Sequence, residues 1–142
     1  MLLGEYSHQV DDKGRFRLPA RLKSALGDDF VLTKGTDGCL FVFSAEEFNS
    51  HFRDKLRDVS IADKEAHKPL RQLFSSASQP ECDNQGRVML PQNLRDYAGI
   101  VKNIVTVGVG TRAEIWDAEK WDEYNKNADF DTALSALKDY KI

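Results

Sequence analysis

The chain has 142 residues, a formal net charge of −3, and 41% hydrophobic against 30% charged residues. This balance is ordinary for a globular protein and excludes a largely disordered chain, while the length suits one compact domain or two very small ones. The slight acidic excess weighs against a simple polyanion-binding protein, which is usually basic overall.

The sequence also argues against several other classes of protein. No apolar run approaches the roughly 20 residues of a membrane span, and the N-terminus lacks a basic segment followed by an apolar one. Cys39 and Cys82 are too few for a disulfide framework, which predicts a cytoplasmic protein. His8, His51 and His67 share no short spacing with the cysteines, so we expect no metal and no cofactor. No paired nucleophile and base stands out, so we expect no catalytic residue and no enzyme.

The chain contains an internal repeat. Residues 11–23 align with residues 83–95 at an offset of 72, with identical Asp, Gly, Arg, Leu, Pro and second Leu positions. After a slip of one residue, the segment 43–48 also matches 116–121. Repeats of this kind indicate repeated structural units, and we expect two, covering residues 1–74 and 75–142.

The first repeat opens with two predicted strands. Apolar and polar residues alternate over 6–10, which indicates a half-buried strand. Gly14 then marks a turn, because glycine adopts positive φ without strain. The alternation resumes over 15–18, which predicts that Phe16 and Leu18 face the core while the arginines between them face outward.

A short helix and a hairpin complete each repeat. Pro19 and Gly27 bracket the first helix, which carries Leu22, Ala25 and Leu26 on one side. Short apolar runs around glycine-containing turns then predict hairpin strands, at 30–33 and 40–43 in the first repeat and at 104–107 and 113–116 in the second. The predicted architecture is therefore two ββαββ units.

Further helices are expected to decorate both units. Ser44 with Glu47 forms a capping box ahead of a helix, and Asp117 caps its counterpart. We also expect a stripe of Phe48, Phe52 and Leu56 on the first of these helices, a helix with Pro69 near its start, a last helix carrying Leu134 and Leu137, and a hinge at residues 75–78.

The repeated turn carries an Asp-x-x-x-Arg motif, as Asp11 to Arg15 and again as Asp83 to Arg87. For the two aspartates we favour a turn-organising role, because carboxylates repel phosphates and aspartate readily shapes turns. The arginines are better candidates for binding, since a planar guanidinium can hold a phosphate or a guanine edge through paired hydrogen bonds. A solvated charged surface is the alternative interpretation.

The first motif lies in a basic segment. Lys13, Arg15, Arg17, Arg21 and Lys23 are basic and no residue between 13 and 23 is acidic, which favours binding to a polyanion. The second copy is less basic, because glutamine and methionine replace the lysine and the second arginine. Residues 1–27 hold five basic and three acidic residues, whereas residues 117–142 hold four basic and seven acidic ones.

The doubled motif resembles the MraZ family of bacterial transcriptional regulators. The sequences Asp11-Asp12-Lys13-Gly14-Arg15 and Asp83-Asn84-Gln85-Gly86-Arg87, each followed by Leu-Pro, carry the resemblance. The opening Met-Leu-Leu-Gly-Glu-Tyr and the chain length agree with it.

This resemblance implies an α+β fold with a mainly β barrel core, built as a swapped-hairpin AbrB-like barrel from the two repeats. It implies ring-shaped homo-oligomers, octamers or dodecamers, that bind double-stranded DNA at short promoter direct repeats of the division and cell-wall gene cluster, in the cytoplasm at the nucleoid, most simply as a repressor. The DNA-facing residues that it implies are Lys13, Gly14, Arg15 and Arg17 in the first motif and Gln85, Gly86 and Arg87 in the second.

Two other classes stay open at this level. One is an AbrB-like protein-interaction or antitoxin-like module without specific DNA binding, which the acidic C-terminal region would suit. The other is a small enzyme on a similar barrel, but the sequence points to no titratable residue as a catalytic candidate.

Overall fold

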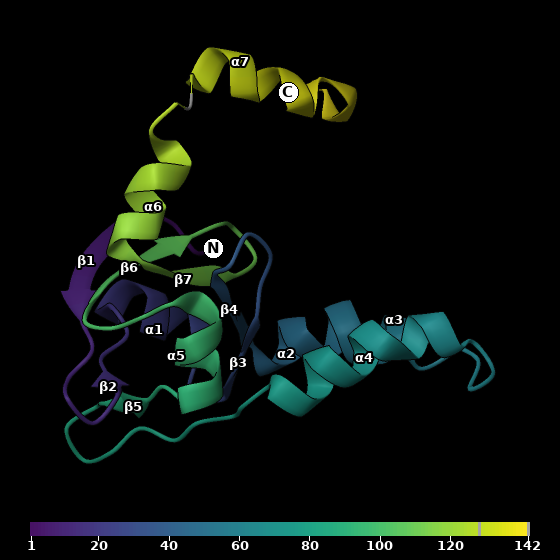
Figure 1. Cartoon of the computed structure of the whole chain (residues 1–142), viewed down its shortest axis with the longest axis horizontal. Coiled ribbons are helices and arrows are strands. Elements are labelled where there is room, and N and C mark those ends of the chain that lie inside the picture. The colour runs from purple at the N-terminus through teal and green to yellow at the C-terminus, as the bar shows by residue number, and fades with distance from the viewer. Residues whose placement is uncertain (128, 142) are drawn as a thin grey trace.

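The computed structural model describes residues 1–127 and 129–141 (Figure 1). Short strands and helices alternate along the chain. The strands are β1 Glu5–Gln9, β2 Arg15–Phe16, β3 Phe30–Lys34, β4 Leu40–Ser44, β5 Val88–Met89, β6 Asn103–Gly108 and β7 Ala113–Asp117. The helices are α1 Ala20–Leu26, α2 Ala45–Phe48, a π-helix Asn49–Arg53, α3 Asp54–Leu56, α4 Lys64–Ser76, α5 Gln92–Ala98, α6 Ala118–Asn125, α7 Phe130–Leu134 and a 3-10 helix Ser135–Tyr140.

The β6–β7 hairpin of the second repeat is inserted between strands β1 and β4 of the first. Five of them form one antiparallel sheet in the order β1-β6-β7-β4-β3, and the two short strands β2 and β5 pair separately. Strand β1 of the first repeat pairs with β6 of the second, and β4 pairs with β7. The α+β class is confirmed, with an antiparallel sheet plus helices, whereas the swapped-hairpin closure stays a prediction.

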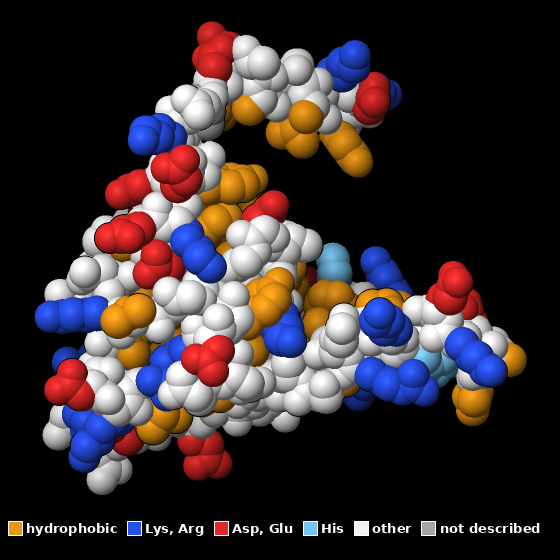
Figure 2. Space-filling model, viewed as in Figure 1, with side chains coloured by type: hydrophobic (Ala, Val, Ile, Leu, Met, Phe, Trp, Pro, Cys, Tyr) orange, Lys and Arg blue, Asp and Glu red, His pale blue; other side chains and the backbone are white. Residues whose placement is uncertain are grey.

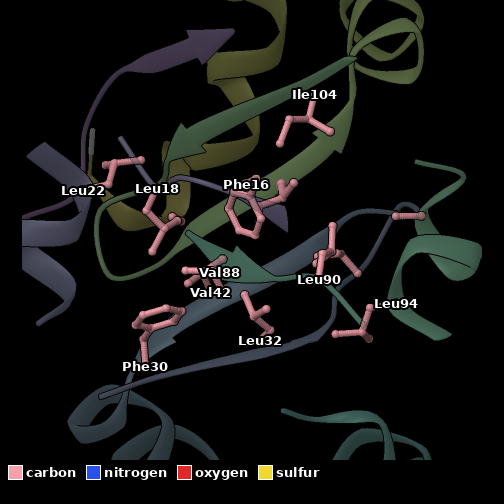
Figure 3. Close-up of a cluster of buried hydrophobic side chains, with 14 of the residues drawn as sticks. Phe16, Leu18, Leu22, Phe30, Leu32, Val42, Val88, Leu90, Leu94 and Ile104 are labelled. Carbon is pink, nitrogen blue, oxygen red and sulfur yellow. The ribbon is translucent and has the colours of Figure 1, made fainter. Parts of the chain in front are cut away.

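One hydrophobic core is shared by both repeats. Figure 3 shows Phe16, Leu18 and Phe30 of the first repeat beside Val88 and Leu90 of the second. All five side chains are buried. Because full burial of a large apolar side chain contributes about 1.5–3 kcal/mol, this shared cluster holds the short β2–β5 ribbon in place.

The local signals in the sequence are largely confirmed. Helices α1 and α5 each follow a proline and end at Gly27 and Gly99. The Ser44 hydroxyl accepts from the Glu47 backbone N–H at 3.1 Å, and the Asp117 carboxylate accepts from Lys120. Ala25 is a correction, because it is exposed while Leu22 and Leu26 are buried.

Two expectations about the connecting segments are wrong. Pro69 lies in the second turn of α4 rather than near its start, because the helix begins at Lys64, capped by Asp63. The segment 75–78 is no hinge: Ser76 is buried at the end of α4, and Ser78 exchanges two backbone hydrogen bonds with Leu32. This isolated bridge anchors the segment to β3.

The helices outside the shared core extend from the body. In Figure 1 the α2–α4 segment projects to one side, and α7 stands apart beyond α6. The side chains of Phe48, Phe52 and Leu56 are half-buried on this arm. The π-helix Asn49–Arg53 interrupts the α-helix that the four-residue spacing predicts. The β2–β5 ribbon lies at the opposite end of the molecule from α7.

Candidate functional site

The first Asp-x-x-x-Arg turn is held by one carboxylate. Asp11 Oδ1 accepts from the backbone N–H groups of Lys13 at 2.9 Å and Arg15 at 2.8 Å. Its Oδ2 accepts from Arg15 Nε at 2.8 Å. The backbone closes the same turn, since Asp11 N donates to Arg15 O and Gly14 N donates to Asp11 O. Arg15 is therefore directed by a bond network contained within five residues.

The second turn repeats this geometry. Asp83 Oδ1 accepts from the N–H groups of Gln85 and Arg87, both at 2.8 Å, and Oδ2 accepts from Arg87 Nε at 2.8 Å. The arginine side chains are also equally accessible, at 26% exposed for Arg15 and 27% for Arg87. The two motifs are thus structurally equivalent in spite of the Lys13-to-Gln85 difference.

The carboxylates of Asp11 and Asp83 accept hydrogen bonds from residues of their own turns. Hydrogen bonds from the Arg15 backbone, with further bonds from its side chain and from Lys13, lower the pKa of Asp11. The backbone N–H of Arg87 is the main cause of the lowered pKa of Asp83. Both groups therefore stay ionised at neutral pH and hold each arginine through Nε.

Long-range contacts bring the two motifs together. Strands β2 and β5 pair so that Arg15 is opposite Met89, and Leu90 N donates to Gly14 O at 2.8 Å. Arg17 Nε reaches across to the backbone oxygen of Gln85 at 3.0 Å. The two turns, 72 positions apart in the sequence, therefore form one continuous surface.

A groove of about 580 Å³ runs along this surface. It gathers five of the residues selected from the sequence. These are Asp11, Arg15, Arg17, Gln85 and Arg87. The other four, Lys13, Gly14, Asp83 and Gly86, belong to the turns beside the groove but are not among its lining residues. Figure 2 shows basic and acidic side chains mixed at the end of the molecule where Figure 1 places β2 and β5.

The groove also contains His8, which the sequence analysis considered only as a metal ligand. His8 lies 2.7 Å from the Thr106 hydroxyl through Nε2, and its ring centroid is 6.1 Å from that of Phe16. Burial lowers its pKa, so the neutral form predominates at neutral pH. The alternating pattern of β1 was the available signal, because it placed His8 on the half-buried face.

The two turns differ in what covers them. Gly14 is buried beneath Arg95 of α5, whereas Gly86 is exposed and a methyl group there would meet nothing within 4 Å. Arg95 was not among the site residues selected from the sequence. In the sequence, Arg95 is marked only by its alignment with Lys23 of the first repeat. That alignment does not indicate which of the two turns Arg95 contacts.

The described part of the chain also contains histidines, cysteines and helices away from the groove. Over residues 1–127 and 129–141, no group of three His, Cys, Asp or Glu side chains could hold a metal ion. Both cysteines are free, and burial raises the pKa of the Cys39 thiol to about 12. No helix within these residues is long and apolar enough to cross a bilayer.

A family of known proteins matches both halves of the chain, as the two Asp-x-x-x-Arg turns predict. The family model described as "MraZ protein, putative antitoxin-like" matches twice, over residues 1–72 and 73–139. The chain belongs to the MraZ family.

Named relatives in this family are similar along the whole chain. "Transcriptional regulator MraZ" of Clostridium beijerinckii is 46% identical over 143 residues, covering 100% of both chains. The proteins of the same name from Acetivibrio thermocellus and Desulforamulus reducens are each 46% identical, over 88% and 91% of this chain and 87% and 90% of their own. The MraZ resemblance carried by the two motifs is thus confirmed.

The paired aspartates predict how stability in this MraZ-family chain depends on pH. Their pKa values are lower in the folded protein than in the unfolded chain, so their contribution is present near neutral pH and is lost as the pH falls through the folded pKa. We expect the double variant Asp11→Asn/Asp83→Asn to lose less stability than the parent between about pH 5 and pH 2, because it lacks the two titrating groups. Urea midpoints measured at several pH values test this.

Asp12→Asn is the matched control, since Asp12 is exposed and makes no side-chain hydrogen bond with the described residues. It should follow the parent curve. A double variant that loses stability as steeply as the parent would contradict the role given to the two carboxylates.

Proposed function

We propose that this protein is a sequence-specific DNA-binding transcriptional regulator that represses the division and cell-wall gene cluster by binding short promoter direct repeats as a ring oligomer. The observation that carries the proposal is the joined pair of Asp-anchored turns, with Arg15, Arg17 and Arg87 along one groove. The name "Transcriptional regulator MraZ" borne by full-length relatives supports the same conclusion.

The two anchored arginines are suited to reading DNA. Because Nε of Arg15 and of Arg87 is bonded to an aspartate, the plane of each guanidinium is set before binding. No described residue accepts a hydrogen bond from their Nη groups, which leaves two parallel donors for a phosphate or for the O6 and N7 atoms of guanine. We propose Lys13, Arg15, Arg17, Gln85, Gly86 and Arg87 as the DNA-facing residues, whereas Gly14, which is buried beneath Arg95, shapes the first turn.

Assembly would supply the affinity that one protomer lacks. Each groove offers only three arginines, two of which are already paired with aspartates, so a single copy should bind weakly. A ring, octameric or dodecameric, presents many grooves to successive direct repeats and raises their effective concentration without new contacts. Exposed apolar side chains beyond α6 are suited to self-association, among them Phe130, Leu137 and Tyr140, and Figure 2 shows hydrophobic side chains gathered on one side of that segment.

Several finer features belong to the same proposal. The two repeats, residues 1–74 and 75–142, would act as pseudo-symmetric AbrB-like units of one swapped-hairpin barrel, which the β1–β6 and β4–β7 pairings between repeats support. The protein would act in the cytoplasm at the nucleoid, as a DNA-binding regulator must. No catalytic residue or cofactor has a role in this mechanism.

The test is binding to the DNA upstream of the protein's own gene as salt is varied. We expect a retained complex whose log affinity falls linearly with log salt, because each phosphate contact releases counterions with a slope of about −0.9. A scrambled duplex of equal length should bind about 1,000-fold or more weakly, which is the usual margin of specific recognition. Fluorescence anisotropy measures both duplexes.

Light scattering on the same preparation is the control for assembly, and a monomeric mass would contradict the ring. Equal affinity for both duplexes would contradict sequence-specific regulation. The antitoxin-like description of the family names the competing function. One stoichiometric protein partner, together with no retained DNA, would favour it.

A further inference from the structure

Arg95 of helix α5 lies directly against the first turn. A methyl group built on Gly14 would be 2.7 Å from Arg95 Cζ and 2.9 Å from each of its Nη atoms. Gly14 has φ +81°, so it is required by its backbone conformation as well as by this contact. The guanidinium of Arg95, a residue of the second repeat, therefore packs on the backbone between Lys13 and Arg15.

This guanidinium has no partner among the residues that the structure describes. Its Nε is shielded from solvent and makes no hydrogen bond. The ion pairs and side-chain hydrogen bonds within residues 1–127 and 129–141 do not include Arg95. A half-buried cation without an acceptor is costly, and the cost is recovered when an anion binds to it.

The equivalent residue in the first repeat behaves differently. Lys23 Nζ donates to Asp28 Oδ1 at 2.7 Å and to Gly27 O at 3.2 Å, next to its own helix. Among the described residues, no atom lies within 4 Å of a methyl group built on Gly86, the glycine that corresponds to Gly14. The unpaired cation is thus specific to the first turn and is not a general property of the repeat position.

We propose that Arg95 and the Lys13–Gly14 turn form an additional anion site, which takes a backbone phosphate of the bound duplex. The inference rests on the DNA-binding function proposed above and extends it to a residue outside the groove. A phosphodiester suits the site, because a guanidinium pairs bidentately with two phosphate oxygens and the exposed Lys13 adds a second positive charge beside it.

The site explains how two equivalent motifs can act unequally. Both arginines of the motifs have the same bonds and accessibility, but only the first turn has Arg95 against it. Phosphate contacts fix the register of a protein on DNA and carry no sequence information directly. Arg95 would therefore anchor the first turn on the backbone while Arg15 reads bases.

The experiment compares Arg95→Gln with its repeat equivalent Lys23→Gln in the full-length protein. For R95Q we expect about tenfold weaker binding to both the upstream and the scrambled duplex, with the salt slope reduced by about 0.9 for each protomer engaged. K23Q should match the parent within about twofold, because Lys23 is already paired to Asp28. Arg95→Met, which keeps an apolar stem, replaces R95Q if the glutamine variant melts below the assay temperature.

Three results would overturn the proposal. An unchanged salt slope in R95Q would show that Arg95 contacts no phosphate. A loss confined to the upstream duplex would make it a reader of bases. A change in the mass of the oligomer would assign Arg95 to a carboxylate of a second copy. If instead the parent protein shows no preference for the upstream duplex, the proposed function itself fails. This outcome is distinguishable from failure of the Arg95 proposal, because it is measured on the parent protein without any variant.

Discussion

Arg15→Ala is expected to remove most of the binding to upstream DNA while leaving the oligomer intact. A bidentate arginine contact to guanine is worth about 1–3 kcal/mol, and the loss recurs in every protomer engaged on the DNA. The fold should survive, because the Arg15–Asp11 pair is partly exposed and solvent screens its contribution to stability. Anisotropy titrations, with light scattering for the assembly, measure both quantities.

Arg87→Ala is the internal comparison, since its turn has the same hydrogen bonds. We expect a smaller loss, because Lys13 and Arg95 accompany only the first motif and Gln85 stands in place of Lys13 in the second. Arg71→Ala, on the exposed surface of α4, is the control for removing a positive charge elsewhere. Equal losses for Arg15→Ala and Arg87→Ala would contradict the dominance of the first motif.

Phe16→Ala is expected to give the largest loss of stability. Phe16 is 2% exposed between two outward arginines and is opposite Val88 across the β2–β5 ribbon. Deleting a buried phenylalanine side chain costs about 3–5 kcal/mol in transfer and cavity terms. For a chain of this size, the corresponding fall in melting temperature is about 10–20 °C. Calorimetry or circular dichroism measures it.

Met89→Ala is the matched control on the partner strand, because Met89 is 46% exposed and pairs opposite Arg15. Its cost should stay below about 1 kcal/mol, as is usual for exposed positions. If Phe16→Ala proved as mild as Met89→Ala, the ribbon would not depend on the shared core. DNA binding by Phe16→Ala should be measured well below its melting temperature, so that lost contacts are not confused with unfolding.

Much of the local structure could be predicted because its causes lie within a few residues. Alternation over residues 15–18 placed Phe16 and Leu18 in the core, and both are buried. Proline and glycine signals bounded α1 and α5 correctly. One of the failures also has a local reason. Pro69 is accommodated in the second turn of α4 because capping by Asp63 starts the helix earlier than the proline signal suggested.

The expected hinge failed for a reason that lies outside its own segment. Serine-rich stretches are typical of flexible connections, and residues 75–78 have that composition. However, Ser78 bonds to Leu32 of β3 through both of its backbone groups. A backbone partner 46 positions away in the sequence leaves no mark on local composition.

Features that depend on short-range contacts could therefore be predicted, whereas features that depend on long-range contacts could not. The doubled turn and the family could be predicted from the residues alone, because side-chain-to-backbone bonds over five residues define each motif. The common groove, the contact of Arg17 with Gln85 and the position of Arg95 over Gly14 could be seen only in the folded chain. These contacts depend on how β2 pairs with β5 and how α5 packs on the shared core, and no periodicity within one repeat encodes that choice.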